Sequence, residues 1–177
     1  MADRSLALTN LPVKLTNFIG REREIAYARG LLPSARLLTV TGPGGIGKSR
    51  LAVEVVAGLL DSYPDGVWLV ELAGLTEPGS VPQAVAAVLG LREESGRDLT
   101  TTIGEHLRSL RLLLLLDNCE HLPRACASLA AELLRTALDL TIIATSRQPL
   151  AVEGEMVWQV PSLSLPASMG MVRSPIS

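Results

Sequence analysis

The sequence predicts an α/β fold of three layers, in which a mostly parallel central sheet lies between two layers of helices. Two observations support this prediction. Apolar runs alternate along the chain with segments of helical periodicity, which is typical of parallel strands joined by crossover helices. The first apolar run leads directly into GPGGIGKS, residues 42–49, a glycine-rich stretch that separates it from an amphipathic helix. Glycine lowers the stability of helices and strands, so a stretch with four glycines is expected to be a loop that binds a ligand.

Four strands are expected from short apolar runs bounded by turn residues. The third and fourth runs are apolar without alternation, as expected for central strands covered on both faces. The predicted strands are Leu37–Thr41, Val67–Glu71, Arg111–Leu116 and Leu140–Thr145.

Four helices are expected between and after these strands, from apolar periodicity and capping residues. Ser80 is placed as the N-cap of the second helix, with Pro82 in its first turn. The fourth helix is rich in Ala and Leu and has the highest intrinsic propensity. The predicted helices are Lys48–Leu60, Val81–Leu89, Leu99–Leu110 and Pro123–Ala137.

Length, charge and cysteine content limit the class of protein. The chain has 177 residues, which is enough for one domain, and a net charge of -2. A domain that binds nucleic acid is normally basic, so direct DNA binding is not expected. Two cysteines without a disulfide framework favour the reducing cytoplasm. The longest apolar run, Leu112–Leu116, is too short to cross a membrane. We therefore expect a cytoplasmic protein without a membrane partner.

The glycine-rich stretch matches the pattern G-x-x-x-x-G-K-[ST] and lies between a predicted strand and a predicted helix. In such a loop the backbone N–H groups converge on a phosphate, and the helix N-terminus adds partial positive charge. Lys48 is expected to reach the β- and γ-phosphates, and Ser49 to ligate Mg²⁺. The predicted nucleotide-binding residues here are Gly42, Pro43, Gly44, Gly45, Ile46, Gly47, Lys48, Ser49 and Arg50.

Asp117 ends the apolar run RLLLLLD and is the predicted partner of Ser49 at the metal. Its strand is expected to lie beside the P-loop strand, so that the carboxylate binds Mg²⁺ through a water. Without the P-loop, a strand-end aspartate would be read as a turn cap. Asn118 occupies the place of a second acid. Glu120 is the nearest spare carboxylate, and it is either a catalytic base or a solvated turn acid.

Arg147 follows another buried run, TIIATS, and is predicted to sense γ-phosphate charge at the carboxyl edge of the sheet. The alternative is a surface arginine at a strand end. Cys119, His121 and Cys126 fall short of a zinc pattern, so packing and a turn histidine are expected instead. Trp68 and Trp158 are expected to be sheet-edge and core aromatics.

Taken together, these motifs resemble the signal-transduction ATPases with numerous domains, the STAND or NB-ARC-like P-loop ATPases. The resemblance rests on FIGREREI at residues 18–25, the P-loop, LLLLLDNCEHL, and IIATSRQPL followed by GEMVWQVPSL. The chain looks particularly like the ATPase segment of LuxR-type or antibiotic-regulator-type bacterial transcription factors. The resemblance implies that the region of Ile19 and Arg21 lies against the adenine, and that Arg147 is the sensor arginine.

The resemblance covers residues 15–163, which predicts a P-loop nucleotide-binding domain there, a flexible segment at 1–14 and an irregular tail at 164–177. Members of this family continue into winged-helix, sensor and often helix-turn-helix segments, and the chain looks like a nucleotide-binding core without them. DNA binding would then belong to those segments.

The expected function is an ATP- or ADP-binding switch core of a regulator, with Mg²⁺ and slow hydrolysis at most. The expected protein partner is a second copy of the chain, through self-association in the ATP-bound state. A free-standing P-loop NTPase or kinase acting on a small substrate is the alternative, and rapid steady-state turnover would favour it. A non-hydrolysing binding module is a third interpretation, which nucleotide affinity without phosphate release would favour.

Overall fold

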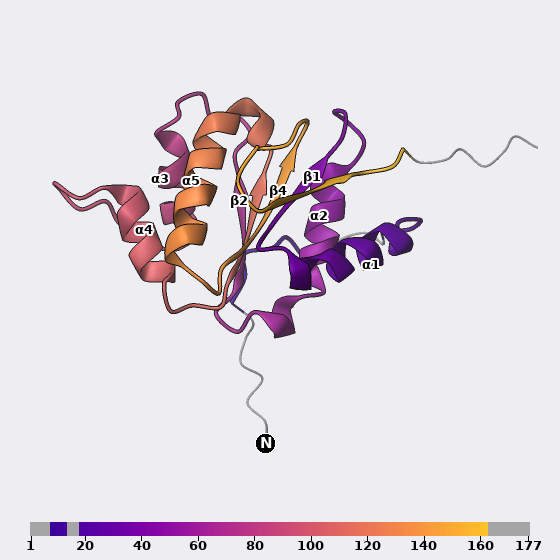
Figure 1. The fold of residues 1–177 in the computed structure, drawn as a ribbon, viewed down its shortest axis with the longest axis horizontal. Helices are drawn as coiled ribbons and strands as arrows, with labels where there is room; N and C mark the ends of the chain where they lie inside the picture. The colour runs from indigo at the N-terminus through magenta and orange to yellow at the C-terminus, as the bar shows by residue number, and fades with distance from the viewer. Residues whose placement is uncertain (1–7, 14–17, 163–177) are drawn as a thin grey trace, which may run out of the picture.

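The computed structural model describes residues 8–13 and 18–162, and it contains a five-stranded sheet in which every neighbouring pair is parallel (Figure 1). The strand order is β2-β3-β4-β1-β5. The strands are β1 Leu37–Thr41, β2 Val67–Glu71, β3 Leu113–Asp117, β4 Thr141–Ser146 and β5 Glu155–Gln159. The prediction of an α/β fold with a mostly parallel sheet is confirmed.

Five α-helices cover the two faces of this sheet. Figure 1 shows α3, α4 and α5 on one face and α1 and α2 on the other. Three short 3₁₀ turns complete the described elements: η1 Leu32–Ser34, η2 Leu60–Ser62 and η3 Cys119–His121. The helices are α1 Glu22–Leu31, α2 Lys48–Ala57, α3 Ser80–Val88, α4 Leu99–Leu107 and α5 Pro123–Thr136.

The hydrophobic core is divided by the sheet because successive side chains of a strand point to opposite faces. In β3, Leu114 and Leu116 pack with α3, α4 and α5, whereas Leu113 and Leu115 pack with α1 and α2. All four leucines are at most 1% exposed. This two-sided burial explains why the run LLLLD lacks polar alternation.

The predicted strands agree closely with the structure, and the differences have local causes. The first two have the predicted bounds, and the other two are shifted by one or two residues. The edge strand β5 was missed because only Trp158 in it is buried, so the run carries a weak apolar signal. The helix α1 was anticipated only as a charged helix start.

Two details of the prediction were wrong. Ser80 is the first residue of α3, and Gly79 occupies the N-cap without a side-chain cap hydrogen bond. The strand that carries Asp117 does not lie beside the P-loop strand, because β4 is inserted between β3 and β1. Which strands become neighbours depends on how the crossover helices pack, and the spacing of motifs along the chain does not report this.

The two edge strands carry the two tryptophans, as expected. Trp68 on β2 is half-buried, and Trp158 on β5 is 9% exposed with its ring 5.7 Å from that of Tyr27.

The outer edge of β2 is further covered by the N-terminal segment. Thr9 forms a parallel bridge with Val67, and the Asn10 side chain bonds both the N–H and the C=O of Leu69.

Two predicted domain boundaries lie outside the described residues, at 14–15 and 163–164. The predicted tail at 164–177 lies outside them too. Within the described residues, no helix combines the length and apolar character needed to cross a membrane.

The contact between α1 and α2 gives a matched pair of stability predictions. The Arg29 guanidinium donates to the carbonyls of Val55 and Glu54 at the end of α2, and a Cβ at Gly58 would collide with it. Gly58→Ala should therefore displace Arg29 and lower the free energy of unfolding by about 1 kcal/mol. Gly30→Ala, in α1 with nothing within 4 Å, should raise it by about 0.5–1 kcal/mol. Denaturant titration of both variants measures this difference, and equal effects would contradict the role assigned to Arg29.

Candidate functional site

The loop between β1 and α2 has the backbone conformation of a phosphate cradle. Gly45 and Gly47 have φ angles of 80° and 91°, which side chains other than glycine rarely adopt. Gly47 is also the N-cap of α2, so the first N–H groups of this helix open toward the loop. Anions bind at such helix N-termini because the N–H groups have no partner within the helix.

Lys48 is the first residue of α2 and folds back over the loop that precedes it. Its ammonium donates to the carbonyl of Gly42 at 2.8 Å and to that of Pro43 at 3.1 Å. The residue is only 6% exposed. The loop carbonyls thus hold the Lys48 ammonium in place. Ser49 follows Lys48 in the first turn of α2 and is half-buried.

Arg147 reaches the P-loop from the end of β4. A Cβ added to Gly44 would lie 3.0 Å from the Nη2 atom of Arg147, so the guanidinium lies against the loop. Because β4 pairs with β1 in register up to Thr41 and Ser146, the residue that follows β4 emerges beside the residue that follows β1. Glycine at position 44 allows this close approach.

Asp117 lies at the carboxyl end of β3 and is 7% exposed. Its Oδ1 accepts a hydrogen bond from the Thr145 hydroxyl, and its Oδ2 accepts one from the Asn118 side chain at 3.1 Å. The same Thr145 oxygen accepts from the backbone N–H of Asn118 at 2.9 Å. These bonds fix the carboxylate at the edge where the P-loop lies, across one intervening strand.

Thr145 was not among the predicted site residues, although it connects Asp117 to β4. It is 1% exposed and lies two residues before Arg147, which the sequence analysis did single out. A buried polar residue at the end of an otherwise apolar strand was the available signal.

Glu120 lies in η3, one short turn beyond Asp117. Its Oε2 atom is buried and has no hydrogen-bond partner among the described residues. The neighbouring Cys119 and Cys126 are buried thiols. A hydrogen bond with Cys126, together with burial, raises the pKa of Cys119 well above its usual value, so this thiol is not a thiolate at neutral pH. Among the described residues, no group of three potential metal ligands gathers here.

The residues predicted to face the adenine are arranged differently from one another. Arg21 is 4% exposed, and its guanidinium donates to the carbonyls of Pro161 at 3.0 Å and Ile46 at 3.2 Å. It therefore ties the start of α1 to the P-loop and to the segment that follows β5. Ile19, in contrast, is 81% exposed. The Arg50 guanidinium lies 5.0 Å from the centre of the Phe18 ring.

These residues share one end of the molecule because parallel strands present their carboxyl ends at the same edge. The P-loop, Asp117, Thr145 and Arg147 all follow or end strands there, and Arg21 joins them through Ile46. Ser49 and Asp117 offer a hydroxyl and a carboxylate, the oxygen donors that Mg²⁺ accepts, often through water. The donor set therefore fits a phosphate chain with its metal.

Comparison with known proteins agrees with this geometry. A model of the AAA domain matches residues 32–152, which span the P-loop, Asp117 and Arg147. The chain belongs to the AAA domain family. This assignment covers β1 to β4 and the four helices α2 to α5 that accompany them.

Several bacterial regulators resemble this AAA domain chain. It is 43% identical over 137 residues to "Putative HTH-type transcriptional regulator Rv0890c" of Mycobacterium tuberculosis, which covers 77% of this chain and 15% of that protein. It is 41% identical over 151 residues to the uncharacterized protein Rv0894 of the same organism, covering 85% and 38% of the two chains. The regulatory protein AfsR of Streptomyces coelicolor is 32% identical over 135 residues, covering 66% and 14%. The chain thus spans a small part of these relatives.

Solved structures support the fold alone. A STAND protein with a tetratricopeptide repeat sensor from Pyrococcus horikoshii aligns with a TM-score of 0.60 at 17% identity, covering 84% of this chain and 24% of the other. Cdc6p from Pyrobaculum aerophilum aligns with a TM-score of 0.60 at 16% identity, covering 83% and 46%. Both likenesses are to the three-layer arrangement of helices and parallel sheet described above.

Proposed function

We propose that this AAA domain binds ATP and ADP with Mg²⁺ and serves as the nucleotide-switch core of a transcriptional or signalling regulator. The observation that carries the proposal is the closed P-loop. Lys48 is held by the carbonyls of Gly42 and Pro43, and Arg147 lies against Gly44. Both cations thus border the place where the loop N–H groups would hold phosphates.

In the proposed complex, Ser49 would hold the metal directly and Asp117 would hold it through a water. Mg²⁺ would supply charge neutralisation for the phosphate oxygens. The Thr145 hydroxyl and the Asn118 amide hold the Asp117 carboxylate at the same edge of the sheet as the loop. Arg147 is the proposed sensor of the γ-phosphate, because its guanidinium lies against Gly44 and would be close to a negative charge bound there.

The adenine contact is proposed for the segment around Ile19 and Arg21. Ile19 is 81% exposed and can offer an apolar surface to a base. The Arg21 guanidinium is already bonded to two carbonyls, so its proposed role is to hold the segment against the P-loop. Arg50 remains a proposed neighbour of the nucleotide through the first turn of α2.

Hydrolysis is proposed to be slow. Pro43, Gly44, Gly45 and Arg147 are exposed, so charges that develop at a terminal phosphate would stay solvated and gain little from preorganised groups. Asn118 offers no carboxylate to polarise water. Glu120 remains a candidate base, but its buried Oε2 atom lies in η3 rather than on the loop.

The regulatory setting is also a proposal. The name of the Mycobacterium tuberculosis relative describes an HTH-type transcriptional regulator, and AfsR is described as a regulatory protein. We propose that this chain performs the STAND-type switch step in such a regulator, of LuxR-type or antibiotic-regulator type, in the cytoplasm. DNA recognition would belong to other parts of these longer proteins, and self-association of the ATP-bound form would transmit the switch.

The test is to titrate residues 1–177 with ADP, ATP, GTP and pyrophosphate, with Mg²⁺ present, and to follow phosphate release. We expect micromolar or weaker adenine nucleotide affinity, about -8 kcal/mol at best, and turnover well below ~1 per second. A gel shift with mixed duplex at low salt should show no binding, given the net charge of -2. Nanomolar affinity with rapid hydrolysis would instead favour a free-standing enzyme.

A further inference from the structure

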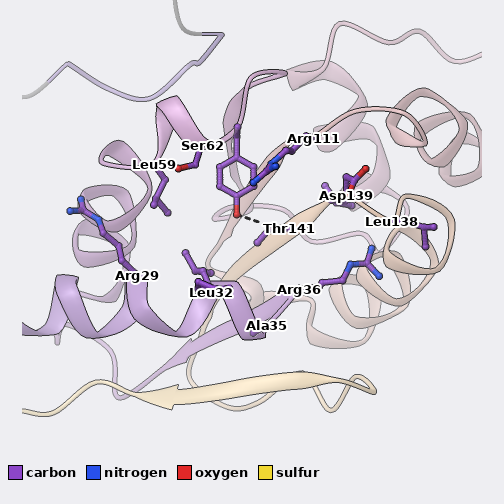
Figure 2. A pocket seen from close by; sticks show the side chains of 13 residues that line it. Arg29, Leu32, Ala35, Arg36, Leu59, Ser62, Arg111, Leu138, Asp139 and Thr141 are labelled. Carbon is purple, nitrogen blue, oxygen red and sulfur yellow. Dashed lines mark hydrogen bonds between the residues drawn. The ribbon is translucent and has the colours of Figure 1, made fainter.

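A cavity of about 420 Å³ lies at the end of the sheet opposite to the P-loop. It is formed where β1 and β4 begin, between η1, η2 and the end of α5, and Figure 2 shows its lining. A five-residue strand is about 16 Å long, so the sheet separates this cavity from the phosphate loop. No step of the proposed nucleotide chemistry uses it.

The lining combines an apolar wall with an excess of positive charge. Leu32 and Leu59 supply apolar surface. Arg29, Arg36 and Arg111 contribute three guanidinium-bearing side chains against the single carboxylate of Asp139. A volume of this size is typical of pockets that hold small organic ligands, which are fixed by a few polar groups on an apolar wall.

Two of these arginines have a structural role. Arg29 bonds the carbonyls at the end of α2, and Figure 2 shows it on the far side of the cavity from Arg111. Arg36 donates to the carbonyls of Leu134 and Ala137 at the end of α5. Its Nη2 atom makes both bonds, so the Arg36 guanidinium is directed to the end of α5.

Arg111 has no such role. Its backbone N–H donates to the Asp65 carboxylate at 2.7 Å, but its guanidinium makes no hydrogen bond or ion pair with any residue that the structure describes. Figure 2 shows the Arg111 side chain near Thr141, whereas the Arg36 side chain extends away from Thr141 toward the side of Leu138. The Thr141 hydroxyl accepts a hydrogen bond from Tyr63 at 3.1 Å, and both residues line the cavity.

We propose that this cavity binds a small organic anion, whose carboxylate or phosphate group contacts Arg111 and whose apolar body packs on Leu32 and Leu59. Guanidinium groups bind both anions through paired N–H donors, so the two anions share one recognition chemistry. Asp139 disfavours ligands with a second negative charge placed near α5. The proposal does not depend on nucleotide binding at the P-loop.

The experiment uses phenylacetate and phenyl phosphate as probes and benzyl alcohol as their neutral analogue, measured by calorimetry on residues 1–177. Arg111→Gln should weaken anion binding about tenfold, the loss expected for a charge-assisted contact at an exposed site. Arg92→Gln removes the same charge from an exposed residue outside the cavity and should leave binding unchanged. Leu138→Glu, at a position that is 72% exposed on the rim, should also weaken binding by repulsion without disturbing the core.

The outcomes separate this cavity from the P-loop. Binding of either probe that falls in Arg111→Gln and Leu138→Glu, but persists in Arg92→Gln and Lys48→Met, supports the proposal and identifies the anionic group. Phenyl phosphate binding that is lost only in Lys48→Met places the anion at the P-loop and overturns the proposal. Benzyl alcohol binding as tightly as phenylacetate, or no binding of either anion at 10 mM of probe (roughly the weak limit of such contacts), also overturns it.

Discussion

Replacing Lys48 by methionine is expected to weaken binding of Mg-ATP and Mg-ADP about a hundredfold. The ammonium is held at the loop by the Gly42 and Pro43 carbonyls, where it would make charge-assisted bonds to the β- and γ-phosphates. Methionine keeps most of the buried stem of a residue that is 6% exposed, so the helix should still pack. The charge is the main quantity removed.

Isothermal titration with ADP and ATP measures this effect, and the thermal unfolding midpoint checks that each variant is folded. Arg92→Met is a suitable control because it removes one positive charge from an exposed residue away from the loop. Its affinity should equal that of the parent chain. A folded Lys48→Met variant with unchanged affinity would show that the glycine-rich loop is not the nucleotide site.

Replacing Asp117 by asparagine should leave nucleotide binding in EDTA intact and abolish the gain in affinity that Mg²⁺ gives. In the proposed complex the carboxylate would act through the metal, so the main effect of losing its charge should appear when the metal is present. The buried position and the bonds from Thr145 and Asn118 make the group well oriented in the parent chain. We therefore expect at least a tenfold loss of the Mg²⁺-dependent gain.

The measurement is ADP affinity across a series of Mg²⁺ concentrations. Asp139→Asn provides a matched control, because it removes a carboxylate at the opposite end of the sheet. Thr145→Val separates orientation from charge: it removes the hydroxyl bond but keeps the carboxylate, so part of the Mg²⁺ gain should remain. An Asp117→Asn variant with the same Mg²⁺ dependence as the parent would exclude Asp117 as a metal residue.

The site illustrates which features local sequence can report. The P-loop was predictable because its glycines, Lys48 and Ser49 lie within eight consecutive residues between a strand and a helix. Asp117 and Arg147 were predictable as strand-end residues, since parallel strands end at one edge. The order of the strands was not, and the prediction that β3 lies beside β1 was wrong because β4 separates them. Thr145 was missed for the same reason, since its bond to Asp117 joins two strands.

The sequence by itself determined the parallel α/β class, the position of the glycine-rich loop and the four strands β1 to β4. It could do so because periodicity and turn residues reflect interactions among a few neighbouring residues. Only the tertiary structure decided which distant groups meet. Arg21 bonds Pro161, 140 residues further along the chain, and the Arg111 guanidinium has no hydrogen-bond or ion-pair partner among the residues that the structure describes. Such contacts depend on how helices and strands pack across the whole sheet, and the burial of the shared core, rather than any local spacing, fixes that packing.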